Sequence, residues 1–293
     1  MLTTCIQDQN RQDKPPLGGG FKRLVNPIKS ITSFIMKIAT WNVNSLRVRL
    51  PHVLDWLEKV EPDVLALQET KTEDSQFPLE PLRSLGYNVV FSGQKTYNGV
   101  ALITRMTPEN GITDIPGLDD PQRRILAATV GGSRIVNLYV PNGSEVGSEK
   151  YAYKLEWLQR VTVWLEGERQ RHDHLLVLGD FNIAPADPDV YDPVAFEGKL
   201  LCSEPERAAF NALLGIGLID SFRHFEQPEK TYTWWDYRMN SFRRNLGLRI
   251  DHILGSETLM SHCLSCGVDQ GPRGLERPSD HAPVLANFGD KAD

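Results

Sequence analysis

Short apolar runs rich in β-branched residues recur along most of the chain, a pattern typical of strands. They predict strands at residues 37–41, 64–68, 87–91, 99–104, 125–130, 134–139, 175–179, 250–254 and 284–288. Between some of these runs the apolar spacing changes to that of a helix face, as at Val53, Leu54, Leu57 and Val60. This spacing predicts helices at residues 49–60, 149–171 and 204–214, the last with Pro205 in its tolerant first turn.

The order of these elements predicts an α/β fold. Two strand hairpins, at residues 87–104 and 125–139, stand among strand–helix–strand units. Such a mixture predicts a four-layer sandwich of two packed mixed β-sheets flanked by helices. No linker or repeat divides the chain after Lys37, so we expect one folded domain at residues 36–290. Residues 1–35 contain Pro15-Pro16 and Gly18-Gly19-Gly20 without sustained periodicity, which predicts a flexible N-terminal extension.

Composition narrows the class of protein only moderately. The 293 residues are 40% apolar and 24% charged, which is ordinary for a globular protein. No apolar stretch approaches the ~20 residues of a membrane helix, and we expect no membrane partner, a monomer and a cytoplasmic location, at the nucleoid if the source is bacterial. The net charge of −6 excludes a general basic coat but leaves a local basic groove open. Cys263 and Cys266 have the spacing of half a zinc site, but no second pair completes it, so ordinary reduced thiols are expected.

Polar residues of catalytic types stand where several predicted strands end. They are Asn42, Asn44, Glu69, Tyr139, Asn142, Asp180, Asn182, Asp251, Asp280 and His281. Residues i and i+2 of an extended strand point to the same side, so Asn42 with Asn44, and Asp180 with Asn182, can face one cleft. Carboxylate, amide and water oxygens are ligands that suit Mg²⁺, and Glu69 is the strongest candidate carboxylate.

Each of these residues also has an ordinary structural interpretation. An isolated Asp or Asn after a strand is most often a turn or helix-cap residue. Taken alone, His281 is typical of a hydrogen-bonded loop histidine, and Tyr139 of a half-buried strand tyrosine. Glu69 fits a solvated turn equally well. The residues therefore indicate a catalytic site only as an ensemble.

The ensemble resembles the exonuclease III family of apurinic/apyrimidinic (AP) endonucleases. The segments that carry the resemblance appear in family order at residues 41–47, 67–71, 139–143, 179–182, 248–251 and 279–283. The likeness runs from Met36 to Phe288, so residues 36–290 are expected to form an exonuclease III-like catalytic domain. Gln68-Glu69-Thr70 or Ser279-Asp280-His281 alone is typical of the wider endonuclease/exonuclease/phosphatase superfamily. The segments 41–47 and 234–251 are more specific.

The resemblance implies a role for each site residue. Asp180 would activate or orient water with Asn182 and Asn42, and Asp251 would orient His281 toward the scissile phosphate. The implied catalytic residues are Tyr139, Asp180, Asn182, Asp251, His281 and Asn42; the implied metal residues are Glu69, Asn44 and Asp280; the implied substrate-binding residues are Asn142, Lys154, Trp234, Arg238 and Leu248. Asn44 departs from the Asp of some family members, and Leu248 stands where some carry Trp.

The implied function is that of a Mg²⁺-dependent DNA-repair nuclease, with Mn²⁺ as the alternative cation. It would hydrolyse the phosphodiester 5′ to abasic sites and act as a 3′–5′ exonuclease and 3′-phosphatase/phosphodiesterase on double-stranded DNA. Another phosphoesterase of the superfamily, acting on inositol phosphates, lipids or RNA, remains an alternative. A non-catalytic DNA-binding module is a further one. The interleaved aromatic and basic residues between Trp234 and Asp251 favour DNA.

Overall fold

Two six-stranded sheets form the body of the chain in the computed structural model, which describes residues 35–290. The first sheet has the strand order β11-β12-β1-β2-β4-β3. Its strands are β1 (Ile35–Asn42), β2 (Val64–Gln68), β3 (Asn88–Ser92), β4 (Val100–Thr104), β11 (Cys263–Val268) and β12 (Val284–Gly289). The predicted extension at residues 1–35 lies outside the described residues, except for its last residue, which begins β1.

The second sheet has the order β5-β6-β7-β8-β10-β9. Its strands are β5 (Glu109–Ile112), β6 (Ile125–Val130), β7 (Ser133–Tyr139), β8 (Leu175–Asp180), β9 (Leu218–Asp220) and β10 (Asp251–Ser256). Each sheet is mixed, because each holds one parallel pair joined by a helical crossover. These pairs are β1 with β2 through α1 (Leu46–Val60), and β7 with β8 through α3 (Glu149–Arg171).

The parallel pairs bring polar residues to one edge of the sandwich. Parallel strands end on the same side of their sheet, and the register opposes Asn42 to Gln68 and Tyr139 to Asp180. The antiparallel strand β10 begins at this edge, where Asp251 opposes Asp180. Residues far apart in sequence therefore converge at the ends of strands from both sheets.

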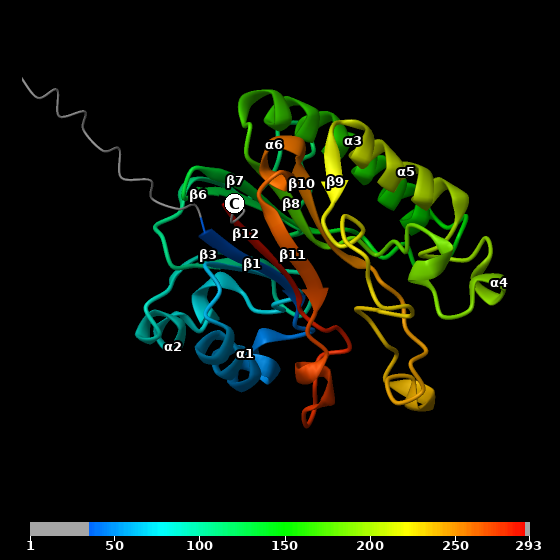
Figure 1. Cartoon of the computed structure of the whole chain (residues 1–293), viewed down its shortest axis with the longest axis horizontal. Coiled ribbons are helices and arrows are strands. Elements are labelled where there is room, and N and C mark those ends of the chain that lie inside the picture. Colours follow the sequence, from blue (N-terminus) through cyan, green and yellow to red (C-terminus); the bar gives the residue numbers. More distant parts are fainter. Residues whose placement is uncertain (1–34, 291–293) are drawn as a thin grey trace, which may run out of the picture. The chain divides into compact units, whose positions relative to one another are not determined.

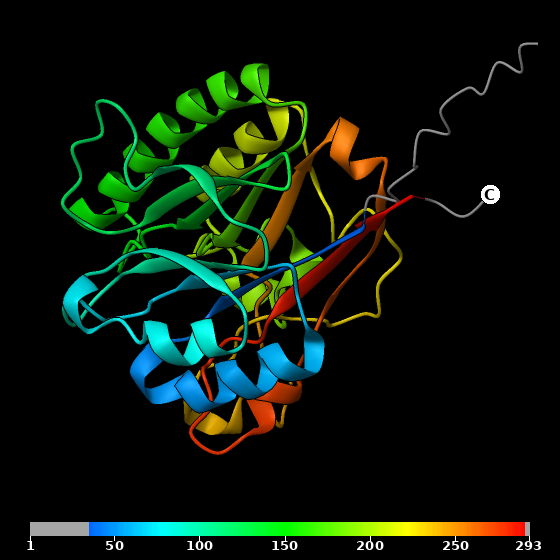
Figure 2. The same cartoon turned by 90° about the vertical axis from the view of Figure 1, so that its left-hand side faces the viewer.

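Helices cover the outer faces of both sheets, giving four layers (Figures 1 and 2). Alternation along each strand supplies the faces: Ile38 points between the sheets, whereas Ala39 and Trp41 pack against α1 and α2 (Leu79–Ser84). On the second sheet, Leu176 and Leu178 join the inter-sheet core, and the intervening Val177 packs toward α3 and α5 (Glu204–Gly215). The two shorter helices are α4 (Pro193–Phe196) and α6 (Glu257–Met260). The predicted four-layer α/β sandwich is confirmed.

The elements that the sequence pattern did not predict are short or lie at sheet edges. They are β5, β9, β11, α2, α4 and α6. Edge strands contact fewer neighbours and carry polar residues, so their apolar signal is weak. Strand β11 contains both Cys263 and Cys266, and no group of metal-binding side chains within residues 35–290 includes either of them. Nor does any helix in that range have the length and apolar character to cross a membrane.

Candidate active site

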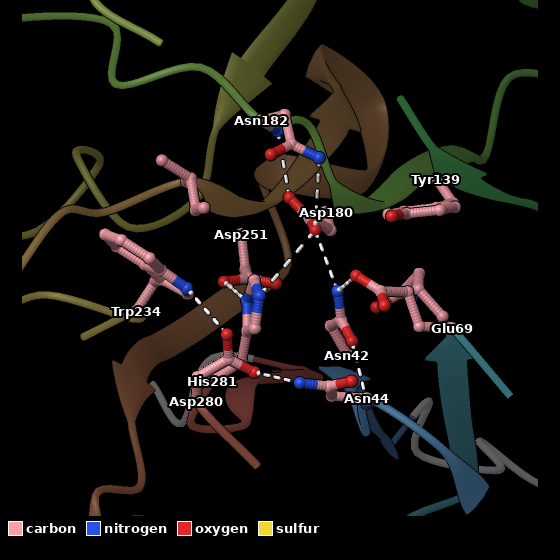
Figure 3. A network of polar contacts seen from close by, with 12 residues as sticks. Asn42, Asn44, Glu69, Tyr139, Asp180, Asn182, Trp234, Asp251, Asp280 and His281 are labelled. Carbon is pink, nitrogen blue, oxygen red and sulfur yellow. Dashed lines mark hydrogen bonds and ion pairs between the residues drawn. The ribbon is translucent and has the colours of Figure 1, made fainter. Parts of the chain in front are cut away.

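The buried side-chain amide of Asn42 joins the carboxylates of Glu69 and Asp180 at the centre of the site (Figure 3). Asn42 Nδ2 donates to Glu69 Oε1 and to Asp180 Oδ2, each at 2.9 Å. Glu69 follows β2 in the first sheet and Asp180 ends β8 in the second, so this amide links the two sheets. The orientation of Asn42 is set by its Oδ1, which accepts the backbone N–H of Asn44 at 2.9 Å.

The loop that carries Glu69 has an unusual backbone. Glu69 has a φ of 51°, in the left-handed region that side-chain-bearing residues seldom adopt. The loop is held by hydrogen bonds from Ser45 N to Glu69 O at 2.8 Å and from Thr70 N to Gly99 O at 3.1 Å. A side chain at Gly99 would place its Cβ 2.2 Å from Thr70 Oγ1, so only glycine permits this close approach. Such local strain is common where a side chain must be aimed at a site.

A histidine–carboxylate pair lies on the other side of Asp180. His281 Nδ1 is 2.8 Å from Asp251 Oδ2, and His281 Nε2 is 3.8 Å from Asp180 Oδ2. All three side chains are buried. Because Asp251 is an acceptor, the Nδ1 of His281 carries a proton, and its Nε2 points into the site toward Asp180.

Ionisation in this cluster is set by burial and by mutual charge. Burial raises the pKa of Asp180 to about 7, against the lowering effect of His281. Burial would lower the pKa of His281, but the carboxylates of Asp251 and Asp180 raise it to about 10. Burial also opposes ionisation of Glu69, yet the Lys71 ammonium, the Asn42 amide and His281 together outweigh it and lower the pKa of Glu69. At neutral pH the site therefore holds an imidazolium beside a carboxylate that can exchange a proton.

Two asparagines extend the hydrogen bonding away from Asp180. Asn182 donates its backbone N–H to Asp180 Oδ1 at 2.9 Å and its Nδ2 to Asp180 Oδ2 at 3.3 Å. Asn142, in the loop after β7, donates its Nδ2 to Asn182 Oδ1 at 3.0 Å. The chain Asn142–Asn182–Asp180 thus runs from an exposed loop into the buried centre.

The predicted metal residues do not form a single group. Glu69 lies with Asp180 and His281, whose ligand atoms are all within 4.8 Å of one another. Asn44 Oδ1 instead accepts the ammonium of Lys71 at 2.6 Å, and Asn44 Nδ2 donates to Asp280 Oδ1 at 2.9 Å. The second oxygen of Asp280 accepts Trp234 Nε1 at 3.0 Å. Asp280 and Asn44 therefore lie next to the Glu69 group with their polar atoms already engaged.

The hydroxyl of Tyr139 points toward Asp180 and Glu69 (Figure 3). Burial raises the pKa of Tyr139 well above its usual value, and both carboxylates act in the same direction. Tyr139 therefore stays protonated and can donate a hydrogen bond into the site. Its ring is held by the guanidinium of Arg124, 4.6 Å from the ring centre.

The predicted substrate-binding residues differ in how exposed their side chains are. Arg238 forms an ion pair with Asp236. Its side chain is still largely exposed, so its guanidinium is available to a ligand. Leu248 is fully buried, and its backbone pairs with both Val190 and Trp234. Trp234 also pairs with His281, so the segment that carries Leu248 connects by backbone bridges to the histidine.

Lys154 does not occupy a position that allows contact with DNA. Its side chain is fully buried, and its ammonium is 2.5 Å from Glu206 Oε1. The physical reason is helical spacing, because Lys154 lies on the buried face of α3 between Tyr151 and Leu158. That spacing was the sequence signal against an exposed lysine. The predicted direct contact of Lys154 with substrate is therefore not supported by this position.

Sequence reasoning missed three residues around Asp280. Lys71 bridges Glu69 Oε2, at 2.8 Å, and Asn44. The hydroxyl of Tyr237 lies 3.1 Å from Arg49 Nη2 and 3.5 Å from Asp280 Oδ1. Lys71 stands within the 67–71 motif and could have been noticed there, whereas Arg49 and Tyr237 are brought together across 188 residues of sequence.

The fold and these groups define a hydrolase for phosphate esters. A proton-accepting carboxylate, a histidine–carboxylate pair, a tyrosine hydroxyl and an acidic group able to hold a cation lie at one sheet edge. The model of the endonuclease/exonuclease/phosphatase family matches residues 39–281. The chain belongs to this family and, within it, to the exonuclease III family of AP endonucleases.

Individual relatives resemble nearly the whole described chain. The chain is 38% identical to exodeoxyribonuclease III of Haemophilus influenzae over 269 residues, and the match covers 86% of this chain and 100% of that protein. The 3′ phosphatase NExo from Neisseria, solved with a product DNA hairpin, is 50% identical with a TM-score of 0.85, covering 86% of this chain and 99% of that chain. An AP endonuclease from Archaeoglobus fulgidus is 39% identical with a TM-score of 0.83, covering 86% and 99%.

Proposed function

We propose that this protein is a Mg²⁺-dependent DNA-repair nuclease. Its reactions would be hydrolysis of the phosphodiester 5′ to abasic sites and removal of nucleotides, phosphates or other blocking groups from 3′ ends of double-stranded DNA. The observation that carries the proposal is the position of Asp180, held by Asn42 and Asn182 and facing His281 Nε2 at 3.8 Å. This arrangement places a proton acceptor beside a cationic donor at one strand edge.

Asp180 is proposed to orient and deprotonate the attacking water. A carboxylate with a pKa of about 7 both ionises at neutral pH and accepts a proton with little thermodynamic cost. Asn42 and Asn182 donate to its oxygens and so fix the direction of the free lone pair. A divalent cation at Glu69 would lower the pKa of Asp180 and increase its ionised fraction.

His281 is proposed to stabilise the negative charge that develops on the phosphate. With a pKa of about 10 it is an imidazolium at neutral pH, and its Nε2–H is the donor that faces the site. The Tyr139 hydroxyl is a second donor, and Asn142 is a third at the exposed side of the site. Preorganised donors of this kind commonly supply a large part of the rate enhancement.

The acidic residues fit a hard cation such as Mg²⁺. Glu69 and Asp180 offer carboxylate oxygens within 4.8 Å of each other, and Mg²⁺ prefers one or two carboxylates with water. We assign His281 to the phosphate and not to the cation, because an imidazolium is a hydrogen-bond donor with no lone pair to share. We propose Glu69 as the principal ligand, with Asn44 and Asp280 supporting it. When bound, the cation would neutralise phosphate charge and stabilise the leaving 3′-oxygen.

Abasic DNA and 3′ ends are proposed as substrates from two lines of support. Trp234 is partly exposed and packs on the buried Leu248 beside His281, so its indole offers an apolar surface suited to a sugar that has lost its base. The solved relatives are described as a 3′ phosphatase bound to a DNA hairpin and as an AP endonuclease. A cytoplasmic, monomeric enzyme remains the prediction for the cell, and Mn²⁺ remains the alternative cation.

Three labelled duplexes test the proposal: one abasic, one intact-ended and one blocked by a 3′-phosphate. Each is digested with Mg²⁺, with Mn²⁺ and with chelator. We expect cation-dependent cleavage of the abasic and 3′-blocked duplexes. Hydrolysis of an inositol polyphosphate with all three duplexes left intact would contradict the proposal and favour another phosphoesterase of the superfamily.

Variants at the centre of the site connect this activity to the proposed chemistry. Asp180→Asn keeps the shape but removes the proton acceptor, and is expected to lower the rate by at least about 100-fold while sparing DNA binding. Asp173→Asn is the matched control, because Asp173 is exposed just before the opposite end of β8. Equal rates for the two variants would contradict the mechanism, and binding without cleavage in the wild type would indicate the non-catalytic module.

A further inference from the structure

Lys154 is a fully buried cation whose three donors are all used. Its Nζ donates to the backbone carbonyl of Asn182 at 2.7 Å, to that of Asn142 at 3.2 Å and to Glu206 Oε1 at 2.5 Å. An ammonium group has three N–H donors, so each is satisfied. Neither Lys154 nor Glu206 has measurable side-chain exposure.

The two carbonyls belong to the two loops that follow the parallel strands β7 and β8. Beyond the strand ends, one backbone hydrogen bond still joins these loops, from Val140 N to Asp180 O at 2.9 Å. Asn182 Nδ2 adds a second connection, to Val140 O at 3.0 Å, and Lys154 adds a third by binding both carbonyls. The side chains of Asn142 and Asn182 also contact each other, because Asn142 Nδ2 donates to Asn182 Oδ1.

Glu206 anchors this connection in a second helix. Its Oε2 accepts the backbone N–H and the hydroxyl of Ser203, at 3.1 and 2.5 Å, and so caps the first turn of α5. The Ser203 hydroxyl in turn lies 2.7 Å from the hydroxyl of Tyr151 on α3. The ammonium is therefore fixed by α3 and α5, both rigid elements of the outer layer.

Burial of this pair is costly in free energy. Removing an ammonium and a carboxylate from water costs several kcal/mol per ion, and their attraction repays this only partly. An apolar pair of similar volume would fill the same space without that cost. The feature that an apolar pair could not reproduce is the set of hydrogen bonds to the two loop carbonyls.

We propose that Lys154 is a positioning residue. It joins the loops after β7 and β8 through their carbonyls and so holds the side chains of Asn142 and Asn182 in place beside Asp180. Its role replaces the direct DNA contact that the sequence resemblance implied. The kinetic part of the proposal rests on the proposed nuclease function; the structural part does not. A misplacement of catalytic groups by about 1 Å can lower a rate by about 100-fold, so this connection has a measurable consequence.

The test is the double substitution Lys154→Met with Glu206→Gln. Replacing both partners avoids leaving a buried carboxylate without a counter-charge. We expect kcat on the abasic duplex to fall about 10- to 100-fold, while KM changes less than about threefold, because the reacting groups and not the wider DNA surface are displaced. Rates are corrected for the folded fraction measured by circular dichroism.

A second buried ion pair, which also involves α3, supplies the matched control. Arg134, near the start of β7, binds Glu168 near the end of α3 at 2.7 Å, with side-chain exposures of 5% and 6%. Arg134→Met with Glu168→Gln removes a comparable pair at the end of β7 away from Tyr139. We expect it to affect stability with kcat and KM unchanged. An equal fall of kcat in both double variants would overturn the positioning role.

A double-mutant cycle and a spectroscopic measurement complete the test. In an Asn182→Ala background the Lys154 and Glu206 substitutions are expected to lower kcat by less than about threefold, because the group they position is already absent. In the metal-free protein they are expected to shift the side-chain amide signals of Asn142 and Asn182. Full additivity in the cycle, or unchanged amide signals, would overturn the proposal.

Two further outcomes separate the inference from the proposed function. If wild-type protein cleaves no DNA but the amide signals respond, the nuclease function fails and the positioning role stands. If wild-type protein cleaves DNA but neither kcat nor the amide signals respond, the positioning role fails alone. Should the double variant not fold, Lys154→Gln retains amide donors and is expected to lower kcat by about three- to tenfold. Wild-type kcat in that variant would overturn the proposal.

Discussion

The substitution Asp251→Asn tests whether His281 acts as an imidazolium. Asp251 Oδ2 lies 2.8 Å from His281 Nδ1, and both side chains are buried. Asparagine retains the shape and an acceptor oxygen but removes the negative charge. The difference between a pKa of about 10 and the ordinary 6.5 corresponds to roughly 5 kcal/mol that favours the charged ring.

Asp251 is the largest of the charges that raise the pKa of His281, ahead of Asp180. Its removal is therefore expected to lower that pKa toward the ordinary value of histidine. Near pH 9 the imidazolium fraction of the wild type is about 0.9. A lower pKa reduces this fraction strongly at pH 9 and much less at pH 6.5. The same charge raises the pKa of Asp180, so its loss also shifts the acidic limb of the rate profile downward.

The assay is single-turnover cleavage of a labelled abasic duplex from about pH 6 to 9.5 at saturating Mg²⁺, paired with an NMR titration of the His281 ring in metal-free protein. Relative to wild type, we expect the deficit of the variant at pH 9 to exceed its deficit at pH 6.5 by about tenfold. A deficit of the same size at every pH, with an unchanged ring titration, would refute the proposed electrostatic role of Asp251.

Three other changes have defined outcomes. Arg249→Met leaves the buried carboxylates of Asp189 and Asp220, at 2.7 and 2.8 Å, without their shared counter-charge, and is expected to lower the free energy of unfolding by about 3–5 kcal/mol in urea titrations. Asn44→Asp adds a carboxylate beside Asp280, and is expected to lower the Mg²⁺ concentration for half-maximal rate about three- to tenfold. Chelation is expected to stop cleavage and to lower the melting temperature, since a cation at 100 times its Kd stabilises the fold by about 2.7 kcal/mol.

Each of these outcomes has a control and a contrary result. Arg160→Met, which removes an exposed pair with Glu156, is expected to cost less than about 1 kcal/mol, and an equal cost at Arg249 would contradict the role of burial. An unchanged Mg²⁺ requirement for Asn44→Asp would show that this position does not influence the cation. A melting temperature unaffected by chelator and by added Mg²⁺ would argue against a cation at Glu69.

The central strands were predictable from local pattern because they are buried on both faces. β2 and β4 are apolar runs that end in Gln68 and Thr104, and β8 adds only Gly179 and Asp180 to such a run. The same reasoning failed at β11, where Leu264 and Ser265 are exposed on an edge strand. It also placed the start of α1 at residue 49 and not at Leu46, and Pro51 lies inside the observed helix.

The sequence identified the residues of the site where polar side chains of catalytic types stand at the ends of strands. Asn42, Glu69, Asp180, Asp251 and His281 were all named from sequence, and the structure brings their side chains together. Their catalytic and metal-binding roles remain predictions until variants are measured.

Sequence by itself determined which residues stand at the carboxyl ends of the apolar strands, since alternation and run length are local properties of the chain. Tertiary structure alone decided their partners, because those contacts cross large sequence separations. It placed Lys71 on Asn44, Arg49 on Tyr237 and Lys154 on the backbone carbonyls of two loops. The charge state of each group follows from such contacts and from burial, so it is set only when the two sheets pack together.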